Sequence, residues 1–475
     1  MTENLATKTI AELAPMIESK EISPVDISKS LLSRIEKYDG EINSYIEVTA
    51  EEQLLEKASK IEKEIMDGQY KGPLHGIPVA LKDIFHIKGE KTTFGSKIHQ
   101  NFIADQDATV IKKLKDSGAF LTGKLTMHEY AAGGTNSNEH YGYCRNPWDL
   151  SRIPGGSSGG SGAAVSADLT IASLGTDTGG SIRIPAAACG IVGLKPTHGL
   201  VSKFGCFPLA WSLDHIGPMT KSVTDAAIML QQIVGQDKRD ATSIIAPLVD
   251  YAASLTGDIA GKVIGIEEDF FFSDVDPDVE VAVKDAIKKL ESLGAKVETV
   301  KIPSLKYANY AEYMTFLAEA ALIHKKNMRL CPEDFGPSVR STLLVGSLVE
   351  TDHYLEAQQM RRLMALDFEQ VWKQVDVLIA PTLPTIAYPI GDSTVTINGK
   401  DIPSNFSFIR YNIPANLLGL PSIALPSGLS NGMPISLQIM GPALSEATIL
   451  NMAYAFEQVN PLAGMKPNLD AVFAQ

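Results

Sequence analysis

The stretch that most constrains this chain is residues 152–183, because it holds two glycine–serine clusters with a small-residue apolar run between them. The clusters are residues 155–162 and 176–181. A flexible linker has no use for a buried apolar middle, so the pattern argues against a linker. We therefore expect a short helix followed by a buried strand, an arrangement that would bring Ser157 and Ser181 together.

The glycines of these clusters allow close approach to a ligand and positive φ, so amides and hydroxyls can converge there on one small substrate. The three residues before Ser181 are Thr178, Gly179 and Gly180. Their N–H groups can turn onto one oxygen as an oxyanion hole, where a single donor typically contributes about 2.7–4 kcal/mol of transition-state stabilisation. Purely structural loops are the alternative that the pattern leaves open.

Ser157 lies in G-G-S-S-G, which also fits the G-x-S-x-G motif of a nucleophile elbow. That motif requires an apolar strand directly before the serine, and residues 150–154 make a poor strand. A serine hydroxyl is a weak nucleophile until a base removes its proton. None of the nine histidines stands in a motif that marks it as that base, so we consider a neutral lysine.

Lys82 is the best candidate for such a base. It follows residues 77–81, a short apolar run that predicts a buried strand. Burial disfavours the charged form of a lysine and lowers its pKa towards neutral pH, as a general base requires. The alternative is that Lys82 only pairs with the adjacent Asp83.

Composition narrows the class of protein. The chain has 475 residues, of which 44% are hydrophobic and 21% charged, as in a soluble globular protein. Its formal net charge of −14 argues against nucleic acid as a partner, because no basic cluster offsets repulsion from phosphates. The four cysteines are scattered, so we expect free thiols. With no visible signal peptide and no membrane-spanning apolar run, we expect a cytoplasmic protein.

The chain reads as one continuous domain over residues 1–475, without internal repeats or low-complexity linkers. Its parts are a layer of helices in 1–70, a motif-rich core in 72–220 and a remaining α/β portion in 221–475. In that last portion, residues 262–300 predict a β-α-β unit, which is typical of layered α/β proteins. Residues 305–368 predict helices that form a wall on the substrate side.

Several segments together resemble the amidase signature family of serine hydrolases, and they follow one another in family order over nearly the whole chain. In order, they are G-I-P-V-A-L-K-D, P-G-G-S-S-G-G-S, G-T-D-T-G-G-S-I-R-I-P-A, G-I-V-G-L-K-P-T, S-L-D-H-I-G-P-M, A-P-T-L-P and G-L-P-S-I-A-L-P-S-G. The combination is highly specific.

This resemblance implies a single-domain α/β fold, with a mixed β-sheet core surrounded by α-helices and with neither a metal nor an organic cofactor. It also implies a Ser-cisSer-Lys triad. Ser181 would be the nucleophile, Ser157 the bridging serine and Lys82 the base. The expected reaction passes through an acyl-enzyme that water then hydrolyses.

The same resemblance assigns residues around the substrate. Thr178, Gly179 and Gly180 would supply oxyanion-hole amides, together with the amide of Ser181. Ala131 matches a family position that lines the substrate pocket.

Within the family we expect a stand-alone amidase that cleaves small carboxamides, with aryl-acylamides and carbamates as further substrate classes. The loop 131–134 contains only small residues, which leaves room for a bulky group. Residues 406–420 contain no Asp or Glu, whereas the glutaminase subunit of the family has an acidic residue in this region. We accordingly expect a small-molecule amide as the partner, with no nucleic acid and no membrane, and we allow for a homodimer.

The alternative is the glutaminase subunit of the aspartyl/glutamyl-tRNA amidotransferase, which works inside a complex that channels ammonia. Tyr313 and Arg361 occupy positions where that subunit has glutamine-binding residues, so this alternative stays open. Glutamine carries an ammonium group, and burying it without a carboxylate would cost several kcal/mol. The location of carboxylates around the site therefore decides between the two substrates.

Overall fold

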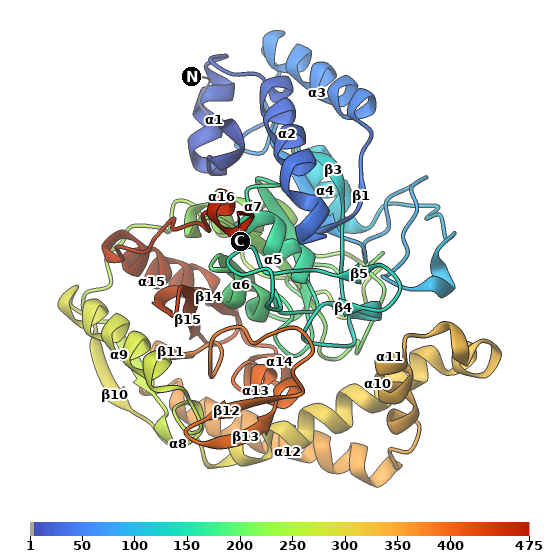
Figure 1. The fold of residues 1–475 in the computed structure, drawn as a ribbon. Coiled ribbons are helices and arrows are strands. Elements are labelled where there is room, and N and C mark those ends of the chain that lie inside the picture. The colour runs from blue at the N-terminus through green and yellow to red at the C-terminus, as the bar shows by residue number, and fades with distance from the viewer. Residues whose placement is uncertain (1–3, 475) are drawn as a thin grey trace.

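An eleven-stranded mixed sheet runs through the computed structural model, which describes residues 4–474 (Figure 1). The strand order is β1-β3-β2-β6-β8-β7-β14-β15-β11-β9-β10. The strands are Tyr45–Val48 (β1), Pro78–Lys82 (β2), Phe120–Leu125 (β3), Ala172–Asp177 (β6), Val192–Lys195 (β7), His215–Thr220 (β8), Val263–Ile266 (β9), Lys296–Thr299 (β10), Val377–Pro381 (β11), Ser422–Ser430 (β14) and Met433–Met440 (β15). Helices surround this sheet, which confirms the predicted single-domain α/β fold.

Both parallel and antiparallel pairs occur in the sheet. Strand β2 is parallel to β3 and β6, and β9 is parallel to β10 and β11, whereas β14 and β15 form a long antiparallel pair. Every residue of β2 and β6 is buried, because the sheet is covered on both faces there. Strands in this position read as continuous apolar runs rather than alternating ones. As the last residue of β2, Lys82 is therefore held in the interior.

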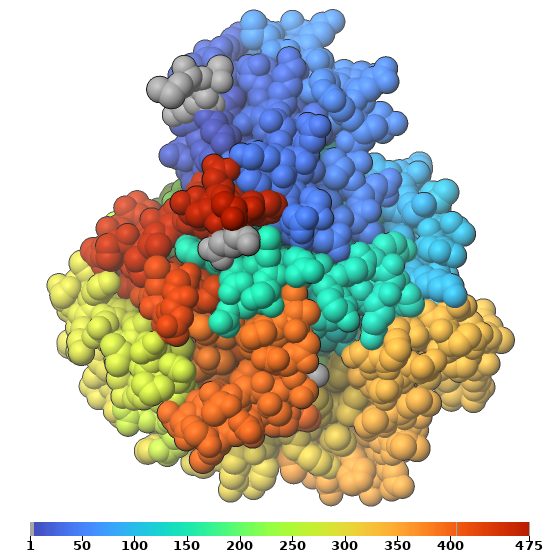
Figure 2. Space-filling view, viewed as in Figure 1, coloured from blue at the N-terminus to red at the C-terminus, as the bar shows by residue number. Residues whose placement is uncertain are grey.

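Three helices form a layer at the N-terminal end of the chain, drawn in blue in Figure 1: α1 (Ile10–Glu18), α2 (Pro24–Ile42) and α3 (Glu51–Met66). Ser23 caps α2, since its side chain accepts hydrogen bonds from the amides of Val25 and Asp26. The C-terminal helix α16 (Leu469–Val472) joins this layer, where Lys37 Nζ lies 2.8 Å from Asp470 Oδ1. Figure 2 shows the red C-terminal segment against the blue layer.

The predicted helix and strand between the two glycine–serine clusters are α5 (Gly159–Ser166) and β6. All residues of α5 are buried, and small residues make this possible. A Cβ on Gly160 would lie 2.5 Å from the carbonyl oxygen of Thr126 and 2.7 Å from that of Ser44. Helix α5 therefore packs directly against backbone. Helix α6 (Arg183–Cys189) follows the second cluster.

The remaining helices cover the rest of the sheet and build the side wall. Helix α9 (Pro277–Ser292) connects the parallel strands β9 and β10, which agrees with the predicted β-α-β unit. In residues 305–368, where helices are predicted, lie α10 (Ala308–Leu330), α11 (Pro337–Gly346) and α12 (Thr351–Val371). The other α-helices are α4 (Thr109–Asp116), α7 (Val223–Ile233), α8 (Glu268–Phe271), α13 (Ser404–Ile409), α14 (Ile413–Leu417) and α15 (Glu446–Val459).

Shorter elements complete the fold. Two small ribbons pair β4 (Ser137–Asn138) with β5 (Gly142–Tyr143) and β12 (Thr394–Ile397) with β13 (Lys400–Pro403). The 3-10 helices are Leu5–Thr7, Lys97–His99, Glu129–Ala131, Pro303–Tyr307 and Pro332–Asp334. Among the helices in residues 4–474, none is both long and apolar enough to span a bilayer.

Candidate active site

Lys82 reaches from the end of β2 to the hydroxyls beside α5. Its Nζ lies 2.8 Å from Ser157 Oγ and 3.0 Å from Ser158 Oγ. A third hydroxyl, Thr176 Oγ1 on β6, lies 2.7 Å away. Parallel pairing of β2 with β6 sets this geometry, because it brings the carboxyl ends of the two strands to the same edge of the sheet. The structure thus brings Lys82 and Ser157 into direct contact.

The side chain of Lys82 is 1% exposed. Burial lowers its pKa to about 7, although the nearby acidic groups Asp177 and Asp214 favour the charged form. The adjacent Asp83 faces Lys124 instead, with Nζ 3.4 Å from Oδ1. The alternative that Lys82 only pairs with Asp83 is therefore wrong. A lysine with this pKa is partly neutral near pH 7 and can accept a proton.

Ser157 is fully buried, and the peptide bond between Gly156 and Ser157 is cis. The carbonyl of Ser157 accepts a hydrogen bond of 3.1 Å from the amide of His128. A Cβ on Gly156 would lie 2.7 Å from the backbone nitrogens of Thr135 and Asn136. The chain therefore needs glycine at residue 156 to bring Ser157 this close to the neighbouring loop.

Ser181 lies at the turn between β6 and α6 and is 8% exposed. Its hydroxyl makes no hydrogen bond with residues 4–474. The N–H of Gly180, predicted as an oxyanion donor, instead donates to Asp177 Oδ1 over 2.8 Å. The amides of Thr178, Gly179 and Ser181 have no partner in the described chain. These three amides are the ones available to a substrate oxygen.

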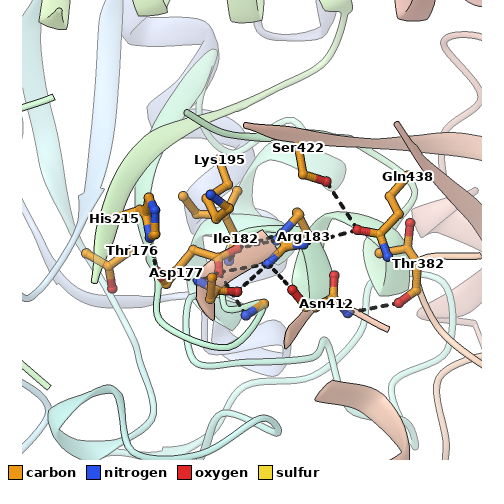
Figure 3. A network of polar contacts seen from close by, with 12 residues as sticks. Thr176, Asp177, Ile182, Arg183, Lys195, His215, Thr382, Asn412, Ser422 and Gln438 are labelled. Atoms are coloured by element: carbon orange, nitrogen blue, oxygen red, sulfur yellow. Dashed lines mark hydrogen bonds and ion pairs between the residues drawn. The ribbon is translucent and has the colours of Figure 1, made fainter. Parts of the chain in front are cut away.

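A buried ion pair holds this turn, and our sequence reasoning gave neither of its residues a role. Arg183 donates from Nε to Asp177 Oδ2 over 3.1 Å and from Nη2 to Oδ1 over 3.2 Å. The same carboxylate accepts hydrogen bonds from the amides of Gly180 and Ile182. Figure 3 shows the guanidinium between Asp177 and Gln438. The sequence feature that could have indicated this ion pair is an aspartate at the end of a buried strand, with an arginine six residues later.

Neighbouring polar groups complete the network around Arg183. The arginine also donates to the carbonyl oxygen of Asn412 over 3.0 Å and to Asn416 Oδ1 over 2.6 Å. Burial alone would raise the pKa of Asp177, but the charge of Arg183 and its hydrogen bonds lower this pKa to about 2. The carboxylate thus stays ionised in the interior because its charge is paired and hydrogen-bonded.

We expect Arg183→Met to lower the free energy of unfolding by about 3–5 kcal/mol, because the charge of Asp177 would stay buried without its partner. Arg362→Met is the matched control. Its ion pair with Glu369 is exposed, and its loss is expected to cost less than about 1 kcal/mol. Urea unfolding at pH 7 measures both values. Equal losses in the two variants would show that the buried pair does not stabilise the fold.

Ala131 lines a cavity of about 360 Å³ that also reaches Thr176 and Thr178. Thr178 Oγ1 donates a hydrogen bond of 2.7 Å to Asp214 Oδ1, another lining residue. The apolar part of the wall comes from Ile84, Phe204, Phe207, Pro208, Leu209 and Trp211. The cavity therefore combines aromatic walls with access to the turn that carries the free amides.

Helix α10 brings a carboxyl group to this turn, and α12 carries Arg361. Glu312 on α10 lies against Gly179, where an added Cβ would be 2.9 Å from Glu312 Oε1. Arg361 on α12 donates to the carbonyl oxygen of Ser212 over 3.1 Å. The ring of Tyr313 packs against Phe406 with centroids 4.8 Å apart. A carboxyl group thus faces the turn from α10, a helix that our argument from residues 406–420 did not consider.

The four cysteines are free, as expected. Cys206 lies beside the site and lines the cavity with Ala131. Burial raises the pKa of its thiol, so this cysteine stays protonated and is a poor nucleophile.

Comparisons with known proteins point to one family. A family model described as Amidase matches residues 26–450. The chain is 42% identical to a glutamyl-tRNA(Gln) amidotransferase subunit of Chromohalobacter salexigens, over 95% of this chain and 96% of that protein. The same subunit from Carboxydothermus hydrogenoformans is 40% identical, with 96% and 98% covered.

Solved structures give the same family. A chain from a vestigial protein complex, studied for the origins of an s-triazine catabolic enzyme, superposes with a TM-score of 0.91 and 34% identity, covering 95% of this chain and 98% of that one. The corresponding glutamyl-tRNA(Gln) amidotransferase subunit of Thermotoga maritima superposes with a TM-score of 0.83 and 36% identity, covering 98% of this chain and 97% of that one. A bacterial aryl acylamidase of the amidase signature family superposes with a TM-score of 0.87 and 28% identity, covering 96% of each chain.

These relatives correct two of our expectations. The expectation that a small amide is the only partner, with no nucleic acid and at most a second copy of the chain, is wrong as stated. Relatives over 95% of the chain are named as one subunit of an enzyme that acts on a tRNA. The expected closeness to stand-alone amidases conflicts with the same relatives. What the family model, the relatives and the solved structures share is the family itself, and this chain belongs to the amidase signature family.

Proposed function

We propose that this chain hydrolyses the C–N bond of a primary carboxamide through an acyl-enzyme on Ser181, with glutamine as its substrate. The observation that carries the chemistry is the buried contact of 2.8 Å between Lys82 Nζ and Ser157 Oγ. A serine hydroxyl needs a base, and a lysine of lowered pKa in hydrogen-bond contact with a serine is suited to that role.

The proposed reaction starts with neutral Lys82, which takes a proton from Ser157 as Ser157 takes one from Ser181. The freed Oγ of Ser181 attacks the carbonyl carbon, and the N–H groups of Thr178, Gly179 and Ser181 bind the oxyanion. Ser157 then protonates the leaving nitrogen and takes a proton back from Lys82, and ammonia departs as the tetrahedral intermediate collapses. Water attacks the acyl-serine by the same proton route, so carboxamide and water become carboxylate and ammonium.

Two observations support glutamine. The relatives at 40–42% identity are named as one particular subunit of a glutamyl-tRNA(Gln) amidotransferase and match nearly the whole chain. Tyr313 and Arg361, which match glutamine-binding positions of that subunit, lie on the helices α10 and α12. Because these relatives are subunits, we infer that the ammonia released here serves a second subunit.

A second candidate function is the hydrolysis of uncharged aliphatic or aryl amides. The absence of an acidic residue in 406–420 favours it, as do the aromatic walls of the cavity beside Ala131. Ammonia or amine release from glutamine, an aliphatic amide, an anilide and a carbamate, measured with purified protein, separates the two. A kcat/KM for glutamine well below that for the neutral amides would select the second candidate.

The proposed base predicts a pH profile. We expect kcat/KM to fall about tenfold per pH unit below pH 7, because protonated Lys82 cannot accept a proton and its pKa is lowered to about 7. Burial and the charge of Lys82 lower the pKa of His128 to about 4, so this histidine does not titrate near neutral pH.

Stopped assays between pH 5 and 9 measure this profile. The fall in kcat/KM below pH 7 is expected to persist in His128→Gln and to be absent from the residual activity of Lys82→Met. A fall near pH 7 that survives in Lys82→Met would assign the base to another group.

A further inference from the structure

The carboxyl group of Glu312 is buried against the turn that carries the free amides, and nothing in the described chain pairs with it. The residue is 3% exposed, and its Oε1 lies where a Cβ on Gly179 would be 2.9 Å away. Its Oε2 is buried without a hydrogen-bond partner. Within residues 4–474 the carboxyl group takes part in no ion pair of 4.0 Å or less. A buried polar group left in this way requires an explanation.

The two cations whose charges act on Glu312 make their hydrogen bonds to other groups. Arg361 donates to Leu417 and to Ser212. Arg183 is used by Asp177 and the network around it. Burial raises the pKa of Glu312 well above its usual range, and the charge of Arg361 opposes this effect only in part.

The other acids nearby differ from Glu312. The carboxylate of Asp177 is held by Arg183, and that of Glu319, two turns further along α10, accepts hydrogen bonds from the amide and hydroxyl of Ser212. Both are therefore satisfied by the protein, whereas Glu312 is not. The next residue along α10 is Tyr313, whose ring packs against that of Phe406. Among these acids, the one without a partner in the described residues is thus the one that lies against the turn that carries the free amides.

We infer that Glu312 is a specificity-determining residue, whose carboxylate binds an ammonium group carried by the acyl part of the substrate. This inference rests on the proposed function and names the feature that the substrate must bring. Burial favours the protonated form of Glu312, and an ammonium in contact with it favours the carboxylate. A carboxylate without that partner, beside amides that bind an oxyanion, would oppose the negative charge of the transition state. A substrate ammonium in contact with Glu312 cancels that repulsion and also pairs the buried acid.

This placement accounts for the acid-free segment 406–420. Asn412 and Asn416 of that segment bind Arg183, so the segment supports the turn rather than the substrate charge. The carboxylate comes instead from α10. The substrate class is therefore an amino-acid carboxamide, of which glutamine is the member considered above.

The test uses a ligand pair that differs only in the ammonium group: L-glutamine and glutaramate, the same chain without its amino group. Isothermal titration with Ser181→Ala protein measures binding of both without turnover. We expect glutamine to bind about 100-fold more tightly than glutaramate, as for a close buried charge pair. Adding Glu312→Gln is expected to remove that preference, and Glu312→Asp to restore part of it.

Glu457→Gln is the matched control, since Glu457 is a half-buried glutamate whose pKa burial raises to about 7 and whose carboxyl group accepts a hydrogen bond from the amide of Val223. It is expected to leave the preference unchanged. A preference that persists in Glu312→Gln, or is absent from the Ser181→Ala protein itself, would overturn the inference. In the active chain, equal losses on glutamine and on butyramide in Glu312→Gln would also overturn it, because butyramide carries no ammonium group.

The two proposals fail in different ways. A Glu312-dependent binding preference in a chain that hydrolyses no carboxamide would support the recognition site and overturn the proposed function. Hydrolysis of glutamine and glutaramate at equal kcat/KM would keep the proposed function and overturn the role of Glu312.

Discussion

Replacing Ser181 by alanine is expected to lower kcat for carboxamide hydrolysis by about 10⁴-fold or more, because the covalent step loses its nucleophile. The stability of the fold is expected to stay unchanged. The side chain is small, and its hydroxyl makes no hydrogen bond with residues 4–474. Thermal unfolding of the variant is therefore expected to match that of the unmodified chain.

Ser161→Ala is the control for this experiment. Ser161 belongs to the first glycine–serine cluster, is fully buried and donates to the carbonyl oxygen of Leu174. We expect this variant to keep kcat within a few-fold. If Ser181→Ala kept kcat within tenfold of the unmodified chain, the nucleophile would have to be another hydroxyl, and Ser157 would be the first to test.

Lys82→Met and Ser157→Ala are each expected to lower kcat by about 10³–10⁴-fold. The double variant is expected to have a kcat no lower than that of the less active single variant. Residues that act as one unit show this loss of additivity, and the 2.8 Å contact between Nζ and Oγ makes the two side chains one unit. Lys82→Met is not expected to lower the melting temperature, because burying the charged form of a lysine is costly.

Ser158→Ala separates the two serines that contact Lys82. Ser158 Oγ is 3.0 Å from Nζ, and it also donates to the carbonyl oxygen of Thr176 over 3.2 Å. We expect a much smaller loss for Ser158→Ala than for Ser157→Ala. Losses that multiply in the Lys82 and Ser157 double variant, or a larger loss for Ser158→Ala, would assign the proton transfer to Ser158.

Part of this architecture can be predicted from local sequence. An apolar run without alternation predicts a strand covered on both faces, and β2 carries Lys82 into the interior as that pattern indicates. Ser23 and Pro24 mark the start of α2 by cap chemistry. The glycine–serine clusters predict α5 and β6, because each backbone conformation depends on residues close in the chain.

The substrate-facing groups depend on contacts that no local pattern contains. Asp177 takes the amide of Gly180, so a residue predicted as an oxyanion donor shapes the turn instead. Glu312 reaches Gly179 only because α10 packs beside a turn that is distant in the chain. Our choice of substrate rested on the small-residue loop 131–134 and on the absence of acids in residues 406–420, and therefore missed it.

The sequence alone predicts the family, the fold class and which side chains are suited to the chemistry. Motif spacing and hydrophobic pattern are properties of the chain itself, so they can be read before folding. Which amides stay free and which acid stays unpaired are decided by the tertiary structure. Hydrogen-bond donors and charges act over a few ångströms, and only packing determines which groups come within that distance.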